Sequence, residues 1–251
     1  MEPNGKAAIV TGGGVGVGRA VALDLARRGA SVAVNYSRSA AEAEETAAAV
    51  EKLGVRALCV KADIRRDEEA RAMAEQAVRA FGRLDVLVNN AGVTRFIDHA
   101  DLDKVTPDDW AFIFDTNVWG MFVCTRAAVP AMRKAGGGAV VNLSSVAGVY
   151  ATGSSIPYCA SKAAINNMTV TLARALAPAI RVNAVAPGFV DTRWWAERAN
   201  KDAIKELATA AAPLKKICQP EDVSKVVLDL VTSDLVTGQV LVVDGGMGIR
   251  S

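Results

Sequence analysis

Short apolar runs, rich in β-branched residues, alternate along the chain with Ala-rich stretches of mixed polarity. Most of the apolar runs are continuous, which is typical of strands buried on both faces of a sheet. In the stretches between them apolar positions recur every three or four residues, as at Met73, Ala77 and Ala80, and this spacing predicts amphipathic helices. The expected strands are Ala7–Thr11, Ser31–Tyr36, Ala57–Val60, Leu84–Val88, Ala139–Leu143, Ile180–Val185 and Gln239–Val243.

This alternation predicts an α/β fold. Repeated strand–helix units give a parallel sheet with helices on both faces, and right-handed crossovers arrange it as an open, doubly wound sheet. The alternative, a (β/α)₈ barrel, needs eight strands, whereas the chain offers seven. We therefore expect a single Rossmann-type domain over residues 1–251, with seven parallel strands.

The segment Gly188–Pro220 interrupts the pattern just before the last helix and strand. It holds Trp194 and Trp195, followed by a polar, Ala-rich helical run. In an open α/β sheet such an insertion lies beyond the carboxyl ends of the strands, where ligands bind. We expect residues 188–220 to form a substrate-binding loop with helices. The alternative is a helical hairpin that serves contacts between subunits.

Charge and rare residues exclude several classes of function. The net charge is +2 and the basic runs are no longer than pairs, so we expect neither a nucleic-acid partner nor an anionic membrane surface. No apolar stretch reaches about 18 residues, so we expect no membrane span. The four cysteines are widely spaced, as free thiols in the cytoplasm are. The single histidine, His99, excludes a two-histidine metal site, and we expect no metal.

The first expected strand ends in a glycine-rich turn that leads into a helix. Its pattern is T-G-x-x-x-G-x-G, on Thr11, Gly12, Gly16 and Gly18. Such glycines let backbone N–H groups approach a pyrophosphate at the helix N-terminus. A P-loop is excluded because Arg19-Ala20 stands where Lys-Ser/Thr is required. The alternative is a tight turn with a structural role alone.

The end of the second strand indicates which dinucleotide binds. A fold selective for NAD places an acid there to accept hydrogen bonds from the ribose 2′-OH, and this chain has none. Ser37 and Arg38, with Arg19, can instead hold a 2′-phosphate. We therefore expect NADP(H) to be favoured over NAD(H). The alternative is that Arg38 is an ordinary solvated loop residue.

Tyr158 and Lys162 are candidates for proton chemistry without histidine. Their spacing of four puts both on one helix face. An ammonium beside a phenol favours the phenolate, so we expect the pKa of Tyr158 to fall below about 10. Cys159 points about 100° away from Tyr158 on a helix, and we expect it to pack without a histidine partner. Without further motifs, the alternative is that Tyr158 and Lys162 are an ordinary pair of surface residues with no catalytic role.

Further motifs, in order and spacing, give the pair its context. They are the glycine motif, Asp63, the N-N-A-G run Asn89–Gly92, Asn117, Ser145 thirteen positions before Tyr158, Lys162, Pro187-Gly188 and Thr192. With them the sequence resembles the short-chain dehydrogenase/reductase family, in its subgroup of about 250 residues, over nearly the whole chain. Within that family it is most similar to 3-oxoacyl-(acyl-carrier-protein) reductases and carbonyl reductases.

The resemblance implies an oxidoreductase that interconverts a ketone and a secondary alcohol by hydride transfer with NADP(H). It makes Tyr158 the general acid or base, and Ser145 a hydrogen-bond donor to the substrate oxygen. Lys162 would bind the nicotinamide ribose and support the phenolate, and Asn117 would hold a water behind Lys162. The expected cofactor-binding residues are Gly12, Gly16, Val17, Gly18, Arg19, Ser37, Arg38, Asp63, Ile64, Asn90, Gly92, Tyr158, Lys162, Pro187, Gly188, Val190 and Thr192.

On the substrate side we expect Ser145, Tyr150, Trp194 and Trp195, which suit an apolar or aromatic ketone. Arg193 would either meet an acidic group of the substrate or be solvated. The resemblance to the family extends to the C-terminal end of the chain, and it implies a homotetramer. The alternatives are an NAD-dependent secondary alcohol or sugar dehydrogenase, a non-catalytic dinucleotide-binding regulator and a Rossmann-like methyltransferase, although the last leaves Tyr158 and Lys162 unexplained.

Overall fold

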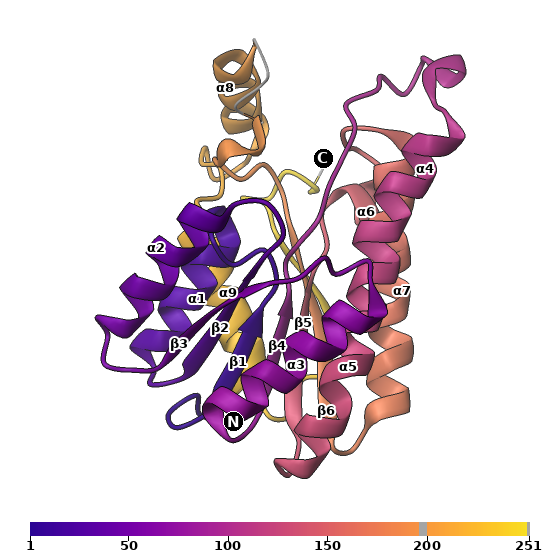
Figure 1. Cartoon of the computed structure of the whole chain (residues 1–251). Helices are drawn as coiled ribbons and strands as arrows, with labels where there is room; N and C mark the ends of the chain where they lie inside the picture. The colour runs from indigo at the N-terminus through magenta and orange to yellow at the C-terminus, as the bar shows by residue number, and fades with distance from the viewer. Residues whose placement is uncertain (196–199, 250–251) are drawn as a thin grey trace.

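The computed structural model of the chain describes residues 1–195 and 200–249, which form one sheet between two layers of helices (Figure 1). The seven strands are all parallel, in the order β3-β2-β1-β4-β5-β6-β7. This confirms the predicted doubly wound sheet, and each predicted run lies on a strand with its ends shifted by two residues or fewer. The strands are β1 Ala7–Val10, β2 Ser31–Tyr36, β3 Ala57–Lys61, β4 Val86–Asn89, β5 Gly138–Leu143, β6 Ile180–Pro187 and β7 Val240–Val243.

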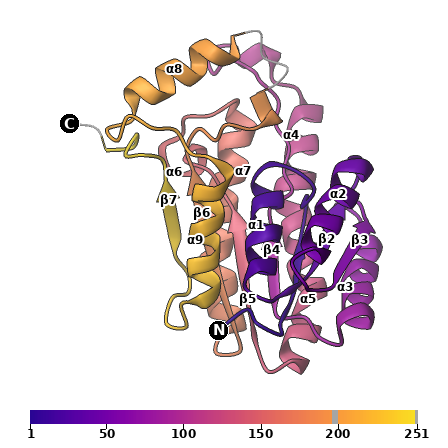
Figure 2. The same ribbon diagram turned by 90° about the vertical axis from the view of Figure 1, so that its left-hand side faces the viewer.

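Three long helices cover each face of the sheet. One layer consists of α1 Gly16–Arg27, α2 Ala40–Glu51 and α9 Pro220–Thr232, and the other of α3 Asp67–Phe81, α5 Met121–Lys134 and α7 Ile156–Leu176 (Figures 1 and 2). Shorter elements lie between them: η1 Leu102–Lys104, α4 Pro107–Phe114, the π-helical η2 Asp115–Gly120, α6 Ala147–Tyr150, η3 Arg193–Trp195 and α8 Lys201–Ala211.

The helices of each layer bury their apolar stripes in one of two cores. Leu25 of α1 and Val227 of α9 belong to the core on the first face, while Met73 of α3 and Met132 of α5 belong to the other. Burying side chains of this size stabilises the fold by about 1.5–3 kcal/mol each. The strands between the two cores are therefore apolar on both faces, which explains their continuous apolar runs.

The local sequence sets where the helices begin and end. The first turn of α3 carries three acidic residues, which its positive N-terminal dipole favours, and Gly82 follows its end with φ +81°. Because the helices run back against the strands, each ends at the amino edge of the sheet. That leaves the carboxyl edge to the loops that follow the strands.

The carboxyl edge of the sheet is where α8 lies, and the N-terminus lies at the opposite end (Figure 1). The chain between β6 and α9 includes η3 and α8. In the ranges 1–195 and 200–249, the structure contains no helix long and apolar enough to cross a membrane.

Candidate active site

The loop after β1 is held by the end of β4. The Asn90 side-chain amide donates to the carbonyl oxygens of Thr11 and Gly12, at 2.9 and 3.0 Å, and the Thr11 hydroxyl accepts from the Asn90 N–H at 2.9 Å. Gly12 and Gly16 have φ of +60° and +52°, a region that favours glycine. A Cβ on Gly18 would lie 2.4 Å from the Gly12 oxygen, so this position also has no room for a side chain.

The N-terminus of α1 opens from this loop. The residue before it, Val15, makes no capping hydrogen bond through its side chain. The first N–H groups of a helix have no partners within the helix, and they favour an anion. The loop and helix therefore make a backbone cradle suited to a phosphate.

Asn35, near the end of β2, is a positioning residue that sequence reasoning missed. Its side chain is buried, accepts from the Gly12 N–H at 3.3 Å, and donates to the oxygens of Val60 and Ala62 at 3.3 and 3.1 Å. It thus joins the glycine loop to the end of β3. The signal was present in the sequence, because an amide interrupts an otherwise apolar strand.

The turn from β2 to α2 holds the residues expected at a 2′-phosphate. Ser37 and Arg38 are exposed there, and Arg19 is exposed on α1. Within the described residues, neither arginine side chain makes a hydrogen bond or an ion pair, so both are available to a ligand.

Arg193 reaches the same turn from the other side of the site. It donates to the Ser39 hydroxyl and pairs with the Glu42 carboxylate, both at 2.7 Å. Arg193 is thus half-exposed and also ion-paired within the protein, with a partner that neither expectation for Arg193 had named. The partners lie about 150 positions away in the sequence, so no local pattern could have indicated them.

The two residues expected near an adenine already have protein neighbours. The Asp63 carboxylate pairs with the Arg65 guanidinium at 2.6 Å, and this hydrogen bond holds the Asp63 pKa below its usual value. Ile64 is buried, and a Cβ on Gly120 would lie 2.8 Å from its Cδ1. Gly120 thus makes room for the Ile64 side chain at the end of η2.

The start of α7 positions Tyr158. The N-cap Ser155 accepts from the Tyr158 N–H at 3.3 Å, and Pro157 lies in the first turn. One turn later, the Lys162 ammonium donates to the Leu143 oxygen at the end of β5, at 2.7 Å, and lies 5.6 Å from the centroid of the Tyr158 ring. The helix therefore places both side chains at the carboxyl edge of the sheet.

Two adjacent serines follow β5, and the structure separates them. Ser145 lies close enough to Tyr158 for its hydroxyl to lower the Tyr158 pKa. Ser144 is buried, and its single hydroxyl proton is shared between the Asn166 Oδ1 at 2.5 Å and the Lys162 carbonyl oxygen at 3.2 Å. Ser145 thus influences the tyrosine, while Ser144 ties β5 to α7.

Asn117 lies in η2, a single π-helical turn of the kind often found at functional sites. Its side chain bonds the backbone N–H and carbonyl of Val93, at 2.8 and 3.0 Å, and donates to the Ser161 hydroxyl at 3.1 Å. A Cβ on Gly92 would lie 3.3 Å from the Asn117 Oδ1 and 3.8 Å from the Lys162 Nζ. The fold thus brings Asn117, Gly92 and Lys162 together.

Burial governs the protonation of the Tyr158–Lys162 pair. It raises the pKa of Tyr158 to about 12, against a smaller lowering by the Ser145 hydrogen bond. It lowers the pKa of Lys162 to about 8. The expectation that Lys162 brings the Tyr158 pKa below its ordinary value is therefore wrong, because desolvation disfavours both charged forms. Tyr158 is a protonated donor at neutral pH.

The chain that follows β6 first contacts the C-terminal segment, the residues after β7, and then the glycine loop. Pro187 is buried at the end of β6, and a Cβ on Gly188 would lie 2.8 Å from the Asp244 Cβ. Val190 forms a β-bridge with Cys218. A Cβ on Gly16 would lie 3.3 Å from the Thr192 Cγ2. The structure thus places Thr192 directly against the cradle, where Val17 also lies.

Aromatic side chains from this segment border the catalytic candidates. The rings of Trp194 and Tyr158 lie 6.1 Å apart. Trp195 stacks on Phe189 at 4.7 Å and lies 5.5 Å from Phe96. Sequence reasoning missed Phe96 and Phe189, although each follows a strand end. Tyr150 is 41% exposed and packs against the C-terminal segment, since a Cβ on Gly248 would lie 2.1 Å from its ring.

His99 lies beside Cys159. Its Nε2 is 3.9 Å from the Cys159 Sγ, so the expectation that no histidine accompanies this cysteine is wrong. Burial nevertheless raises the pKa of the Cys159 thiol. The thiol is therefore protonated at neutral pH, and the pair is not an activated nucleophile.

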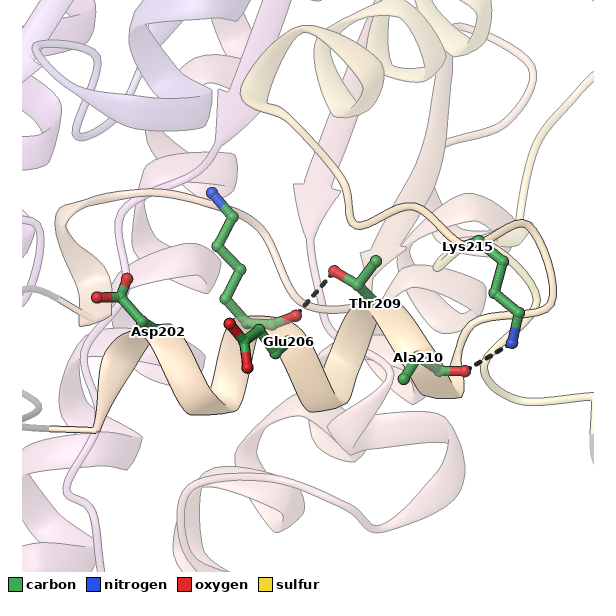
Figure 3. A pocket seen from close by; sticks show the side chains of 6 residues that line it. Asp202, Glu206, Thr209, Ala210 and Lys215 are labelled. Atoms are coloured by element: carbon green, nitrogen blue, oxygen red, sulfur yellow. Dashed lines mark hydrogen bonds between the residues drawn. The ribbon is translucent and has the colours of Figure 1, made fainter.

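A hollow of about 520 Å³ lies along α8, away from these residues. It is lined by one helix and the turn that follows it, and charges of both signs surround it (Figure 3). None of the expected site residues belongs to it. Its lining residues are Asp202, Lys205, Glu206, Thr209, Ala210 and Lys215.

Comparisons with known proteins agree with this site. A family model described as enoyl-(acyl carrier protein) reductase matches residues 13–248. A protein of Streptomyces violaceoruber, named as ketoacyl reductase 2 of the granaticin polyketide synthase, is 46% identical over 97% of this chain and 96% of its own. The 3-oxoacyl-(acyl-carrier-protein) reductase FabG of Staphylococcus aureus is 39% identical over 96% of this chain and 98% of its own.

Solved structures agree as well. A short-chain type dehydrogenase/reductase from Mycobacterium marinum superposes with a TM-score of 0.91 at 31% identity, covering 99% of this chain and 98% of that one. The chain therefore belongs to the short-chain dehydrogenase/reductase family. It is an NAD(P)-dependent oxidoreductase that resembles the 3-oxoacyl-(acyl-carrier-protein) reductases and interconverts ketones and alcohols.

Proposed function

We propose that this protein reduces a ketone to a secondary alcohol with NADPH, and that Tyr158 is the proton donor. The cluster of Ser145, Tyr158 and Lys162 at the carboxyl edge of the sheet carries the proposal. The glycine loop lies at the same edge, which is where ligands bind in open α/β sheets. A non-catalytic regulator has no need of a proton donor in this place.

The residues present fit a dinucleotide. The cradle has no room for a Cβ at Gly18, and it leads to the uncapped N-terminus of α1. Arg19 and Arg38 are exposed and unpaired within the part of the chain that the structure describes, and β2 ends without an acid, which supports NADP(H) over NAD(H). The remaining candidates along the site are Gly12, Gly16, Val17, Ser37, Asp63, Ile64, Asn90, Gly92, Tyr158, Lys162, Pro187, Gly188, Val190 and Thr192.

The chain's own residues handle the oxygen and the proton. When bound, the nicotinamide supplies the hydride for reduction. Negative charge then develops on the substrate oxygen, where Ser145 and Tyr158 are donors, each typically worth about 3 kcal/mol. Tyr158 passes its phenolic proton to that oxygen, and the Lys162 ammonium stabilises the phenolate that remains. Asn117 holds a water behind Lys162 for reprotonation.

Residues 188–220 form the substrate-binding segment, with Tyr150, Trp194 and Trp195 as its walls. The Trp194 ring near Tyr158 supports an apolar or aromatic ketone. The relatives named as ketoacyl reductases support a 3-oxoacyl thioester or a polyketide intermediate.

The working form is a homotetramer in the cytoplasm. Trp110 and Trp119, on α4 and η2, are 39% and 45% exposed, and Leu241 and Val242 lie exposed on the edge strand β7. Two separate apolar surfaces of this kind support contacts across two axes. Free thiols at Cys59, Cys124, Cys159 and Cys218 support a reducing compartment.

The test is loss of NADPH absorbance with a panel of 3-oxoacyl thioesters and aromatic ketones. The proposal predicts turnover with at least one of them, and a lower KM for NADPH than for NADH. Binding of NADPH without turnover of any ketone would support the regulator instead. Turnover with NADH alone would support an NAD-dependent dehydrogenase.

A further inference from the structure

Arg193 lies between two ends of the site: the β2–α2 turn, where a 2′-phosphate is expected, and the catalytic end at Tyr158. Its guanidinium binds Ser39 and Glu42 at the start of α2, both at 2.7 Å. Its neighbour Trp194 places an indole 6.1 Å from the catalytic tyrosine candidate. Its other neighbour, Thr192, contacts the glycine loop at Gly16. Three consecutive residues thus contact three parts of the site.

The rest of the substrate segment has its own anchors. Asp191 pairs with Lys205 of α8 at 2.5 Å, and Val190 forms the bridge to Cys218. These contacts hold the segment to itself and to the residues before α9. The Arg193 contacts are different, because they join the segment to the start of α2, next to the turn that carries Ser37 and Arg38.

The charges in the β2–α2 turn connect Arg193 to cofactor binding as well. Arg38 is exposed in this turn, and Glu42 lies four residues further on, in the first turn of α2. While Arg193 pairs with Glu42, the two charges cancel and Arg38 gives the turn a net positive charge. Without Arg193, the free carboxylate would oppose a 2′-phosphate and would offer an acceptor to a ribose 2′-OH.

We propose that Arg193 is a positioning residue that couples the two ends of the site. It anchors the tryptophans beside Tyr158 to α2, and it neutralises Glu42 so that the adjoining turn accepts a 2′-phosphate. Cofactor selection and ketone binding then depend on the same side chain. The inference rests on the proposed function for the identity of the ligands, but the anchor itself does not.

The experiment uses Arg193→Gln, Glu42→Gln and the double variant. Cofactor fluorescence gives the Kd of NADPH and of NADH. Arg193→Gln should weaken NADPH about fivefold while NADH changes less than about twofold, as expected for a half-exposed charge. Glu42→Gln in the same chain should restore NADPH binding, because the uncompensated carboxylate is then gone. Arg79→Gln, which removes an exposed arginine from its surface pair with Glu75 far from the β2–α2 turn, is the control.

Ketone kinetics and proteolysis test the anchor. Arg193→Gln and the double variant should both raise the KM for the ketone about fivefold, with kcat nearly unchanged, since the tryptophans lose their tether in each. Chymotrypsin should cut residues 188–220 of the cofactor-free protein faster in Arg193→Gln and in Glu42→Gln than in the wild type or Arg79→Gln.

Two results would overturn the coupling: equal changes in the Kd of NADPH and NADH, or a proteolysis rate that matches the wild type. If the wild-type protein binds no NADPH, the proposed function fails. The proteolysis of cofactor-free protein then still decides whether the ion pair anchors the segment.

Discussion

At the residue scale, desolvation shapes the proton chemistry of the site. Tyr158 keeps its proton with a pKa of about 12, and Lys162 loses its own near pH 8. At neutral pH the pair therefore holds an acid and a nearby cation, which is the state that ketone reduction needs. Alcohol oxidation needs the phenolate, which is scarce at this pH.

The pH profile should show this asymmetry. Lys162 has its pKa lowered, so its charge is present below about pH 8 and lost as the pH rises above that value. Because that charge stabilises the Tyr158 phenolate, kcat/KM for NADPH in ketone reduction should be constant from pH 6.5 to 7.5 and fall above about pH 8. Alcohol oxidation should rise as the pH approaches 8, because the Tyr158 phenolate that it needs becomes more abundant while Lys162 is still charged. A reduction rate that stays level beyond pH 9.5 would contradict this role for Lys162.

The sequence predicted the pair of side chains but not their pKa values. The spacing of four residues placed Tyr158 and Lys162 on one helix face, and the thirteen positions from Ser145 to Tyr158 selected the serine that lowers the Tyr158 pKa in the structure. Desolvation depends on what covers the two groups, including Trp194 from a segment far along the chain. This cover depends on tertiary packing, which neighbours in the sequence do not reveal. For that reason the predicted direction of the Tyr158 pKa shift was wrong.

At the scale of elements, the glycine loop is shaped by its neighbours as much as by its own residues. Asn90 and Asn35 hold it from β4 and β2, and both side chains bond Gly12. The strand ends and the loop therefore form one unit. The glycine motif was visible in the sequence, whereas the partners of Asn35 and Arg193 appear only when distant segments pack together.

Gly18→Ala tests the close approach in this unit. A Cβ there would meet the Gly12 oxygen and the Asn90 amide, and such overpacking costs about 1–3 kcal/mol. We expect Tm to fall by roughly 3–10 °C and NADPH binding to weaken, as calorimetry and fluorescence titration would show.

Gly82→Ala provides the control for backbone strain. Gly82 has φ +81° and open space around it, so the variant should lose stability without weakening NADPH binding. Equal loss of NADPH affinity in both variants would show that the effect of Gly18→Ala is general destabilisation.

At the scale of the whole molecule, the sheet order determines where the chemistry lies. The order reverses between β1 and β4, and the carboxyl ends of β1, β4, β5 and β6 carry the loops of the site. Continuous apolar runs and their helical spacers were sufficient to predict this architecture. They could not indicate subunit contacts, because Trp110 and Trp119 look like core residues in the sequence but are exposed in the single chain.

The exposed apolar surfaces predict an assembly in solution. Sedimentation at micromolar concentration should give four times the chain mass of 26.2 kDa. Trp119→Glu should reduce the assembly, because it puts a charge into one apolar surface. A monomeric mass for the wild-type protein would contradict the tetramer, and a dimeric mass would leave only one of the two surfaces in use.

The most direct test of the account is the turnover of Tyr158→Phe. This variant removes the phenolic proton and keeps the ring, so kcat for NADPH-dependent ketone reduction should fall at least about a hundredfold. The Kd of NADPH should stay within about twofold of the wild type, and the neighbouring Cys159→Ala should keep its turnover. Near-normal turnover in Tyr158→Phe would contradict Tyr158 as the proton donor.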